Sequence, residues 1–372
     1  MKNEIVEDKI CLIYNFAQHY RLGIFKLLDR GLKMDFYFGD KMGDIKKLNY
    51  GELSGFKGEL KNIRILSNFY WQSGAVKLFF KDNYQSFLLL GEYYCISTWL
   101  ILFFSLFSNK KVYLWSHGWY GKEGRVVSFI KKIFFSMSDA IFLYGEYAKK
   151  LMVAEGIKET KLHVIYNSLD YENQIRVRKS LSQNTLYKEH FGNDDPILFF
   201  IGRLTKVKKL DMVIDALDLL RKSGQNFNLV IVGNGEEREY LIDKCAKLFL
   251  DKRVWFVGEL YSEDKIGEYI FNADLCISPG NVGLTAMHSL VYGTPVITHD
   301  DFKYQMPEFE AVQNGYTGLF FQKDNLEDLY EKIMYWKTLN FDRQVVRQRC
   351  FQVIDEKYNP QYQYKIFSKN LI

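Results

Sequence analysis

Short apolar runs alternate with helix-like segments along the first half of the chain. Neighbouring parallel strands need a crossover of a dozen or more residues, usually a helix, so this alternation is typical of a parallel sheet covered on both faces. The pattern therefore predicts an α/β domain with a doubly wound sheet. The expected strands are residues 10–14, 34–38, 63–66, 87–90, 112–115, 140–144 and 164–166, and the expected helices are 21–30, 74–82, 95–108, 124–137 and 146–155.

A second series of the same kind follows a polar stretch at residues 171–195, which is either a linker or a loose helix. With 372 residues the chain can hold two domains, each with its own core. We expect an N-terminal domain at 1–168, a C-terminal domain at 169–345 and a helical tail at 346–372 that packs back on the N-terminal domain. Ligands of two such facing domains bind between the carboxyl ends of their sheets. The second series predicts strands at 197–201, 228–232, 254–257, 274–277, 295–298 and 318–321, and helices at 208–223, 236–250, 263–271, 284–292 and 325–337.

Two stretches of the second half together predict one anion-binding site. Residues 197–208 are an apolar strand that runs into Gly202, Arg203 and, five residues later, Lys208; residues 278–288 are a glycine-punctuated loop that enters a helix. Such a loop offers unpaired N–H groups and the positive end of the helix dipole to an anion. Arginine and lysine add two full charges suited to phosphate oxygens. Together the stretches indicate a diphosphate site, and hence a nucleotide-activated ligand.

The same half resembles the C-terminal domain of the retaining GT-B glycosyltransferases in the "glycosyl transferases group 1" family. Four segments carry the resemblance in order: Gly202-Arg203-Leu204 with Lys208, residues 229–236, residues 254–258, and residues 283–319. The N-terminal half is similar only in its alternation of strands and helices. The resemblance implies a GT-B fold, with two Rossmann-like domains that face a central cleft. It also implies that the donor lies on the C-terminal domain and the acceptor on the N-terminal domain.

Residue roles follow from the resemblance. The donor diphosphate would be held by Arg203, Lys208, Gly283, Leu284 and Thr285; nucleotide or ribose contacts would come from Gly233, Asn234, Phe256, His288 and Glu308; the catalytic candidates are His117 and Asn281, and the acceptor-side candidates are His19 and Arg21. Each residue also has a structural interpretation. Arg203 and Lys208 can form a solvated basic face, and Gly283 can serve a tight turn. Glu92, after the strand at 87–90, is an acceptor candidate by location alone.

The chain departs from the family signature, which is usually Glu-x7-Glu. Aligned on residues 283–285, the two signature positions hold Gly280 and His288, so both carboxylates are missing. His288 can still hydrogen-bond a ribose hydroxyl, and Asn281 can meet a sugar hydroxyl. Two interpretations follow: a variant branch that binds the sugar differently, or a catalytically weak protein. The intact phosphate-binding segments favour the variant branch.

The resulting hypothesis is a retaining, metal-independent hexosyltransferase without a cofactor. The donor would be a nucleotide sugar, expected to be UDP-linked with galactose as the hexose. GDP-sugars are the alternative donors. The acceptor would be lipid-linked or a saccharide, in bacterial O-antigen, lipopolysaccharide or capsule biosynthesis. The alternatives are a sugar-nucleotide or glycan-binding protein that has lost catalysis, and a GT-B epimerase or phosphorylase. No motif indicates nucleic-acid binding.

Charge and aromatic content add a membrane hypothesis. Residues 1–165 hold 24 Lys and Arg against 16 Asp and Glu, a net of +8, whereas the whole chain carries +5. Aromatic and basic residues mix at 99–111 and 129–135, which fits either core helices with solvated ends or a face resting on an anionic membrane. The apolar run at 99–107 is too short to span a bilayer, and the polar start predicts no signal peptide. The five scattered cysteines show no zinc-ligand spacing. We expect a cytoplasmic protein, peripheral on the inner face of the membrane.

Overall fold

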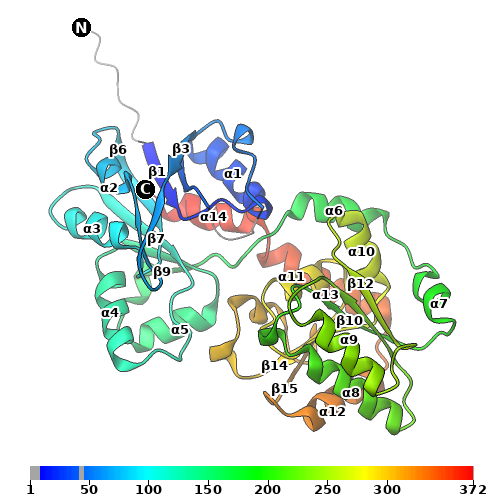
Figure 1. Cartoon of the computed structure of the whole chain (residues 1–372). Helices are drawn as coiled ribbons and strands as arrows, with labels where there is room; N and C mark the ends of the chain where they lie inside the picture. Colours follow the sequence, from blue (N-terminus) through cyan, green and yellow to red (C-terminus); the bar gives the residue numbers. More distant parts are fainter. Residues whose placement is uncertain (1–8, 42–45, 372) are drawn as a thin grey trace. The chain divides into compact units, whose positions relative to one another are not determined.

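The computed structural model describes residues 9–41 and 46–371. The chain forms two compact units (Figure 1). The first unit consists of the described parts of Met1–Asp170 and Asn359–Ile372, and the second of Tyr171–Tyr358. Each unit has its own sheet and core.

A seven-stranded parallel sheet forms the centre of the first unit. Its order is β3 (Phe56–Leu60), β2 (Asp35–Gly39), β1 (Lys9–Tyr14), β6 (Tyr84–Leu90), β7 (Lys111–Ser116), β8 (Ala140–Leu143) and β9 (Leu162–Val164). The strands read as apolar runs because both faces are buried. One face packs on α2 (Ala75–Phe79), α3 (Ile96–Ser105), α4 (Arg125–Ser136) and α5 (Glu146–Ala154), and the other on α1 (Leu22–Leu32) and α14 (Pro360–Asn370).

The prediction for residues 63–66 was wrong in one respect. These residues lie in β4 (Asn62–Leu66), which pairs antiparallel with β5 (Phe69–Gln72) as a separate hairpin and does not join the parallel sheet. The strand that does join, β3, was not predicted, because its sequence alternates polar and apolar residues around Gly58. An apolar run was therefore assigned to the core although it belongs to an exposed hairpin.

The second unit has a six-stranded parallel sheet. Its order is β12 (Val254–Gly258), β11 (Asn228–Val232), β10 (Ile197–Ile201), β13 (Leu275–Ser278), β14 (Val296–His299) and β15 (Gly318–Phe321). One face is covered by α8 (Leu210–Lys222), α9 (Arg238–Lys247) and α12 (Leu326–Thr338). In α8 the buried residues recur at helical spacing, which fixes the face that meets the sheet. The helices α10 (Glu263–Asn272), α11 (Leu284–Val291) and α13 (Arg343–Lys357) also belong to this unit.

Two stretches that the sequence left loosely defined are helical. Residues 171–195 contain α6 (Tyr171–Ser180) and α7 (Leu186–Phe191), both of which pack on α10. The helical region expected as a tail from residue 346 is divided, since α13 packs on α11 in the second unit. Only α14, red in Figure 1, lies beside α1 in the first unit. Gly31 on α1 permits this close packing, because a Cβ there would lie 2.0 Å from the hydroxyl of Tyr364.

Candidate functional site

The carboxyl ends of the strands in the second unit surround a hollow of about 580 Å³. The strand order runs outward in both directions from the neighbours β10 and β13, and ligands of such sheets bind beyond the strand ends at this point. The lining comes from the loops after β10, β11, β12 and β13. It includes Gly202, Arg203, Lys208, Gly233, Asn234, Glu259, Tyr261, Asn281, Leu284, Thr285 and His288.

Glycines let the loops around the hollow approach one another. At Gly233, with φ of +132°, a Cβ would lie 1.9 Å from the carbonyl oxygen of Gly202. Gly283 has φ of +49° where it precedes α11. A side chain is strained at such φ values, so both positions favour glycine. The positive φ of Gly283 therefore agrees with a tight turn at this residue.

Arg203 and Lys208 bring positive charge to the hollow. The Arg203 side chain is exposed, and it makes no hydrogen bond or ion pair with any residue that the structure describes. Lys208 Nζ donates to the carbonyl oxygen of Asn281 at 2.5 Å, which ties together the two loops that the sequence linked. Burial lowers the pKa of Lys208 to about 8, opposed by the nearby Glu308 carboxylate and aided by Arg203.

The amino end of α11 faces the same hollow through Leu284 and Thr285. Among the described residues, no side chain caps this end and the N–H of Leu284 has no acceptor. The N–H of Thr285 donates to Val282 and its hydroxyl donates to the carbonyl oxygen of Ile201 at 2.7 Å. Thr285 thus joins α11 to β10, and Leu284 offers the N–H that an anion can meet.

His288 lies one turn further along α11 and lines the hollow. Its Nδ1 is buried without a partner in the described structure. Burial lowers the pKa of His288, and the Glu263 carboxylate opposes that effect. Glu263 accepts hydrogen bonds from Tyr292 Oη at 2.7 Å and from Gln174 Nε2 at 3.1 Å. The imidazole is therefore neutral near pH 7, and the residue borders the hollow.

The structure places the three expected nucleotide contacts Asn234, Phe256 and Glu308 in different environments. Asn234 lines the hollow, while its Oδ1 accepts from the N–H of Gly235 at 2.9 Å. Phe256 packs against the core cluster and is not among the residues that line the hollow; beyond the end of β12 that wall is built by residues 259–261. Glu308 is buried and is not among the residues that line the hollow, but its carboxylate raises the pKa of Lys208. Phe256 was expected at the ligand because strand ends face it, but its side chain points to the core.

In the first unit, His117 follows β7 and lines a small hollow of about 80 Å³ together with Glu92 and Lys131. Burial and, to a lesser extent, the charges of Arg21 and Lys131 together lower the pKa of His117 to about 3. The imidazole is thus neutral, and its Nδ1 has no partner in the described structure. Its ring packs 4.6 Å from that of Tyr144.

The two acceptor-side candidates have different environments. Arg21 is buried among aromatic rings, with its guanidinium 5.3 Å from the Tyr144 ring and 5.4 Å from that of Trp115. His19 is exposed, and its Nδ1 lies 3.3 Å from the carbonyl oxygen of Lys46. The structure therefore places Arg21 near His117, whereas His19 lies at the surface.

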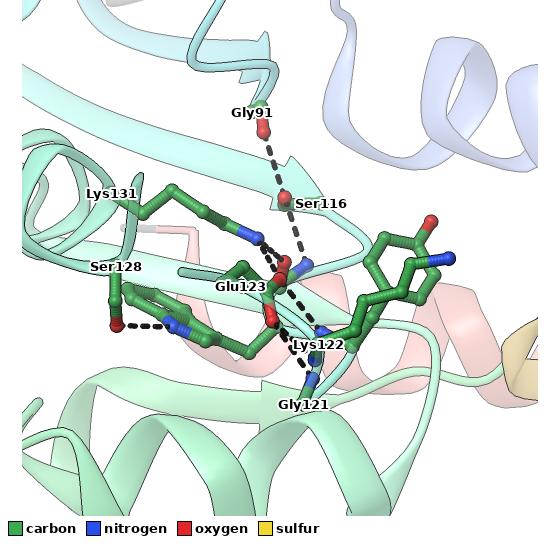
Figure 2. Close-up of polar contacts among 10 residues, drawn as sticks. Gly91, Ser116, Gly121, Lys122, Glu123, Ser128 and Lys131 are labelled. Carbon is green, nitrogen blue, oxygen red and sulfur yellow. Dashed lines mark hydrogen bonds and ion pairs between the residues drawn. The ribbon is translucent and has the colours of Figure 1, made fainter. Parts of the chain in front are cut away.

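The loop that carries His117 is held by a buried ion pair (Figure 2). Lys131 Nζ on α4 lies 2.6 Å from Glu123 Oε1 and donates to the carbonyl oxygen of Gly118 at 2.6 Å. The Glu123 carboxylate also accepts from the N–H groups of Tyr120, Gly121 and Lys122. Sequence reasoning missed this pair, because it placed Lys131 either at the solvated end of a core helix or on a face resting on a membrane. No local motif signals it, since the partners lie on a loop and a helix.

Residues 182–350 match the family described as Glycosyl transferases group 1. That stretch contains every loop around the larger hollow. Among the described residues, no group of three or more His, Cys, Asp or Glu side chains could hold a metal ion, and no helix is long and apolar enough to cross a bilayer.

Curated relatives match part of the chain. An uncharacterized 41.2 kDa protein in the cps region of Klebsiella pneumoniae is 25% identical over 58% of this chain and 57% of its own length. The uncharacterized glycosyltransferase MJ1607 of Methanocaldococcus jannaschii is 30% identical over 37% of this chain and 36% of its own. The capsular polysaccharide biosynthesis glycosyltransferase CapM of Staphylococcus aureus is 26% identical over 54% and 52%. This chain thus spans less than two thirds of each relative.

Solved structures resemble the whole chain. The Anabaena protein Alr3699/HepE in complex with UDP has a TM-score of 0.74 at 13% identity, covering 98% of this chain and 99% of that one. The apo form of the lipopolysaccharide outer core galactosyltransferase WaaB has a TM-score of 0.71 at 15% identity, covering 97% and 98%. At these identities the likeness shows the fold alone, which is the expected GT-B fold with two Rossmann-like domains.

Proposed function

We propose that this chain, a glycosyltransferase that carries a Glycosyl transferases group 1 domain at residues 182–350, moves a hexose from a UDP-sugar to a saccharide or lipid-linked acceptor. The observation that carries the proposal is the hollow of the second unit, where Arg203, Lys208 and the open end of α11 meet. Positive charge, N–H groups and a neutral imidazole on His288 suit a diphosphate joined to a ribose. The solved neighbours that contain UDP and UDP-glucose support this donor class.

The same groups can promote transfer. When the bond between the sugar and the diphosphate breaks, negative charge grows on the departing phosphate. Arg203, Lys208 and the N–H of Leu284 are fixed where they stabilise that charge more in the transition state than before it. In the proposed metal-independent mechanism they supply the positive charge that a metal would otherwise bring. Retention of configuration is proposed from the family resemblance, with His117 and Asn281 as the polar groups of the sugar-transfer machinery.

The pathway is proposed from the relatives. The cps-region protein, CapM and WaaB belong by name to capsule or lipopolysaccharide systems. We assign this chain to the synthesis of a bacterial surface polysaccharide, with galactose as the first hexose to test.

A ligand screen tests the donor. Ligands that bind only the native state raise its melting temperature, so Tm is measured with UDP, GDP, ADP and CMP and with their sugar conjugates. We expect UDP and UDP-hexoses to raise Tm and the other nucleotides to have smaller effects. Failure of every sugar nucleotide to raise Tm would contradict the proposal.

A binding protein without catalysis is the second candidate, because Gly280 and His288 occupy the positions of the family's two glutamates. Incubation with the stabilising UDP-sugar separates the two functions. Release of UDP, with or without an acceptor, supports the enzyme. Saturable binding without UDP release supports the binding protein.

We also propose that the first unit rests on an anionic membrane through α3 and α4. Both helices expose large apolar side chains, including Leu100 and Phe103 on α3 and Val126 and Phe129 on α4. Arg125 and Lys132 are exposed on α4, whereas Lys131 takes no part because it is buried with Glu123. Exposed apolar side chains beside basic ones suit an interfacial contact. Sedimentation with phosphatidylglycerol vesicles, but not with phosphatidylcholine vesicles, is the expected result.

A further inference from the structure

The β4–β5 hairpin of the first unit has an unusual polarity. Residues opposite each other on antiparallel strands share a face, so Asn62 pairs with Gln72 on one face and Ile63 with Trp71 on the other. The polar face meets the body of the unit: Asn62 Nδ2 donates to the carbonyl oxygen of Asn15 at 2.8 Å, and Gln72 Nε2 donates to that of Tyr14 at 2.9 Å. The other face is therefore both apolar and directed away from these contacts.

Four large apolar side chains of this hairpin are exposed. The exposed fractions are 42% for Ile63, 54% for Ile65, 74% for Leu66 and 40% for Phe69. An antiparallel pair with one solvated face normally places polar residues on that face. A cluster of exposed apolar side chains is informative because it marks an interaction site more often than a scattered single residue does.

A polar hollow of about 230 Å³ begins at the base of the same hairpin. It is lined by Asn15, Lys41, Asn62, Tyr70, Glu92 and Tyr94. All six side chains can form hydrogen bonds, and amides, phenols and a carboxylate together can both donate to and accept from sugar hydroxyls. The volume is below the roughly 300–1,000 Å³ of sites for drug-sized ligands, so it suits a single sugar ring.

Glu92 is the centre of this hollow. Its carboxylate accepts from Tyr70 Oη at 2.7 Å and from Asn15 Nδ2 at 3.3 Å. It also borders the small hollow that contains His117. Burial raises the pKa of Glu92, although its hydrogen bonds oppose the shift. The Glu92 carboxyl group can accept hydrogen bonds from sugar hydroxyls, and Lys41 in the same lining can donate to them.

We propose that the first unit binds a lipid-linked acceptor sugar, with a neutral sugar ring in the polar hollow beside Glu92 and the hydrocarbon along the apolar face of the β4–β5 hairpin. The two parts are continuous, because Asn62 and Tyr70 belong to the hairpin and also line the hollow. A ligand with a polar head and an apolar tail matches both at once. The inference rests on the proposed glycosyl transfer, and it selects one of the two acceptor classes.

Paired glycosides test the inference on the full chain. The probes are methyl and dodecyl glycosides of galactose, glucose and N-acetylglucosamine, below their micellar concentrations, with binding followed by saturation-transfer NMR. The dodecyl form of the preferred sugar is expected to bind at least about tenfold more tightly than the methyl form, since burying two methylene groups already exceeds that factor.

Two variants separate the head from the tail. The double variant Ile65→Thr/Leu66→Ser should lose the preference for the dodecyl form while binding methyl glycosides as before. Glu92→Gln should weaken both forms by about fivefold to tenfold, as for the loss of a charge-assisted hydrogen bond. Tyr70→Phe tests the same head contact by a change that removes only a hydroxyl. Phe249→Asn, at a residue 85% exposed in the second unit, is the matched apolar-to-polar control.

Three results would overturn the inference. They are an unchanged dodecyl preference in the hairpin variant, unchanged binding in both Glu92→Gln and Tyr70→Phe, and no binding of any dodecyl glycoside by a chain that still binds a sugar nucleotide. Loss of binding to acceptor-free vesicles in the hairpin variant would assign the hairpin to the bilayer and reject the acceptor. Failure of sugar-nucleotide binding would instead count against the proposed function.

Discussion

Charged side chains are paired differently in the hollow of the second unit and in the first-unit cluster formed by Lys131, Glu123 and His117. In the hollow, Arg203 has no acidic partner in the described structure and Lys208 contacts only a carbonyl oxygen directly. In the cluster, Lys131 is neutralised by Glu123 at 2.6 Å, and the nearby His117 is neutral. Positive charge without a direct ion pair suits the binding of an anion in the hollow. Compensated charge fixes a loop and presents neutral hydrogen-bonding groups.

The largest expected effect is on the stability of the first unit. Lys131→Ala leaves the buried Glu123 carboxylate without its cation, and breaking a buried ion pair costs about 3 kcal/mol. We expect Tm of the first unit to fall by roughly 6–12 °C, as measured by scanning calorimetry.

A double variant sharpens this test. Lys131→Met/Glu123→Gln removes both charges but keeps an acceptor oxygen for the N–H groups of residues 120–122. It should recover part of the lost stability, because no unpaired charge stays buried. If Lys131→Ala melts like the parent, the pair does not hold the loop.

The next effect concerns catalysis in the second unit. Arg203→Ala removes a charge fixed beside the proposed diphosphate, and loss of one such group lowers kcat/KM by about 100-fold. The matched control is Lys206→Ala, which removes an exposed charge from the same loop but does not line the hollow. Equal effects of the two substitutions on UDP release would reduce the hollow to a general basic surface.

The contrast between the units explains which parts could be predicted from the sequence. Gly202, Arg203 and Lys208 directly follow one apolar strand, so local order was enough to predict their meeting at a strand end. The two hollows of the first unit instead combine Asn15, Glu92 and His117, which follow three different strands. Only the strand order brings them together, and no spacing along the chain reveals it.

The errors also have physical causes. Ile63, Ile65 and Leu66 are apolar, and apolarity normally signals burial, but all three side chains are exposed on the hairpin. Glu263 was not singled out, because the family signature drew attention to His288 and not to the neighbouring α10. Sequence reasoning therefore predicted both sheets apart from β3, and it predicted that the loops after β10 and β13 lie close together, but it missed the partners that tertiary packing supplies.

A pH titration of donor binding gives a smaller effect. The pKa of Lys208 is lowered to about 8, so its ammonium loses the proton as the pH rises through that value. Binding of UDP-glucose, whose diphosphate stays ionised, should be tightest below pH 8 and weaken by roughly tenfold toward pH 9–10. Lys208→Arg keeps its charge throughout, so its profile should be flat. A parent profile as flat as that of the arginine variant would show that Lys208 does not meet the donor.

The smallest effect concerns His288, which we propose to occupy the position of the second glutamate of the family signature. If His288 bonds a ribose hydroxyl, His288→Ala should weaken UDP-glucose binding about fivefold, as for one neutral hydrogen bond of about 1 kcal/mol. Measuring each protein with UDP-glucose and with its 2′-deoxy and 3′-deoxy analogues isolates the contact. The parent should prefer the intact ribose over at least one analogue, and the variant should not. A preference that survives the substitution means another residue recognises the ribose, and Glu263, which acts on His288 from α10, is the next to test.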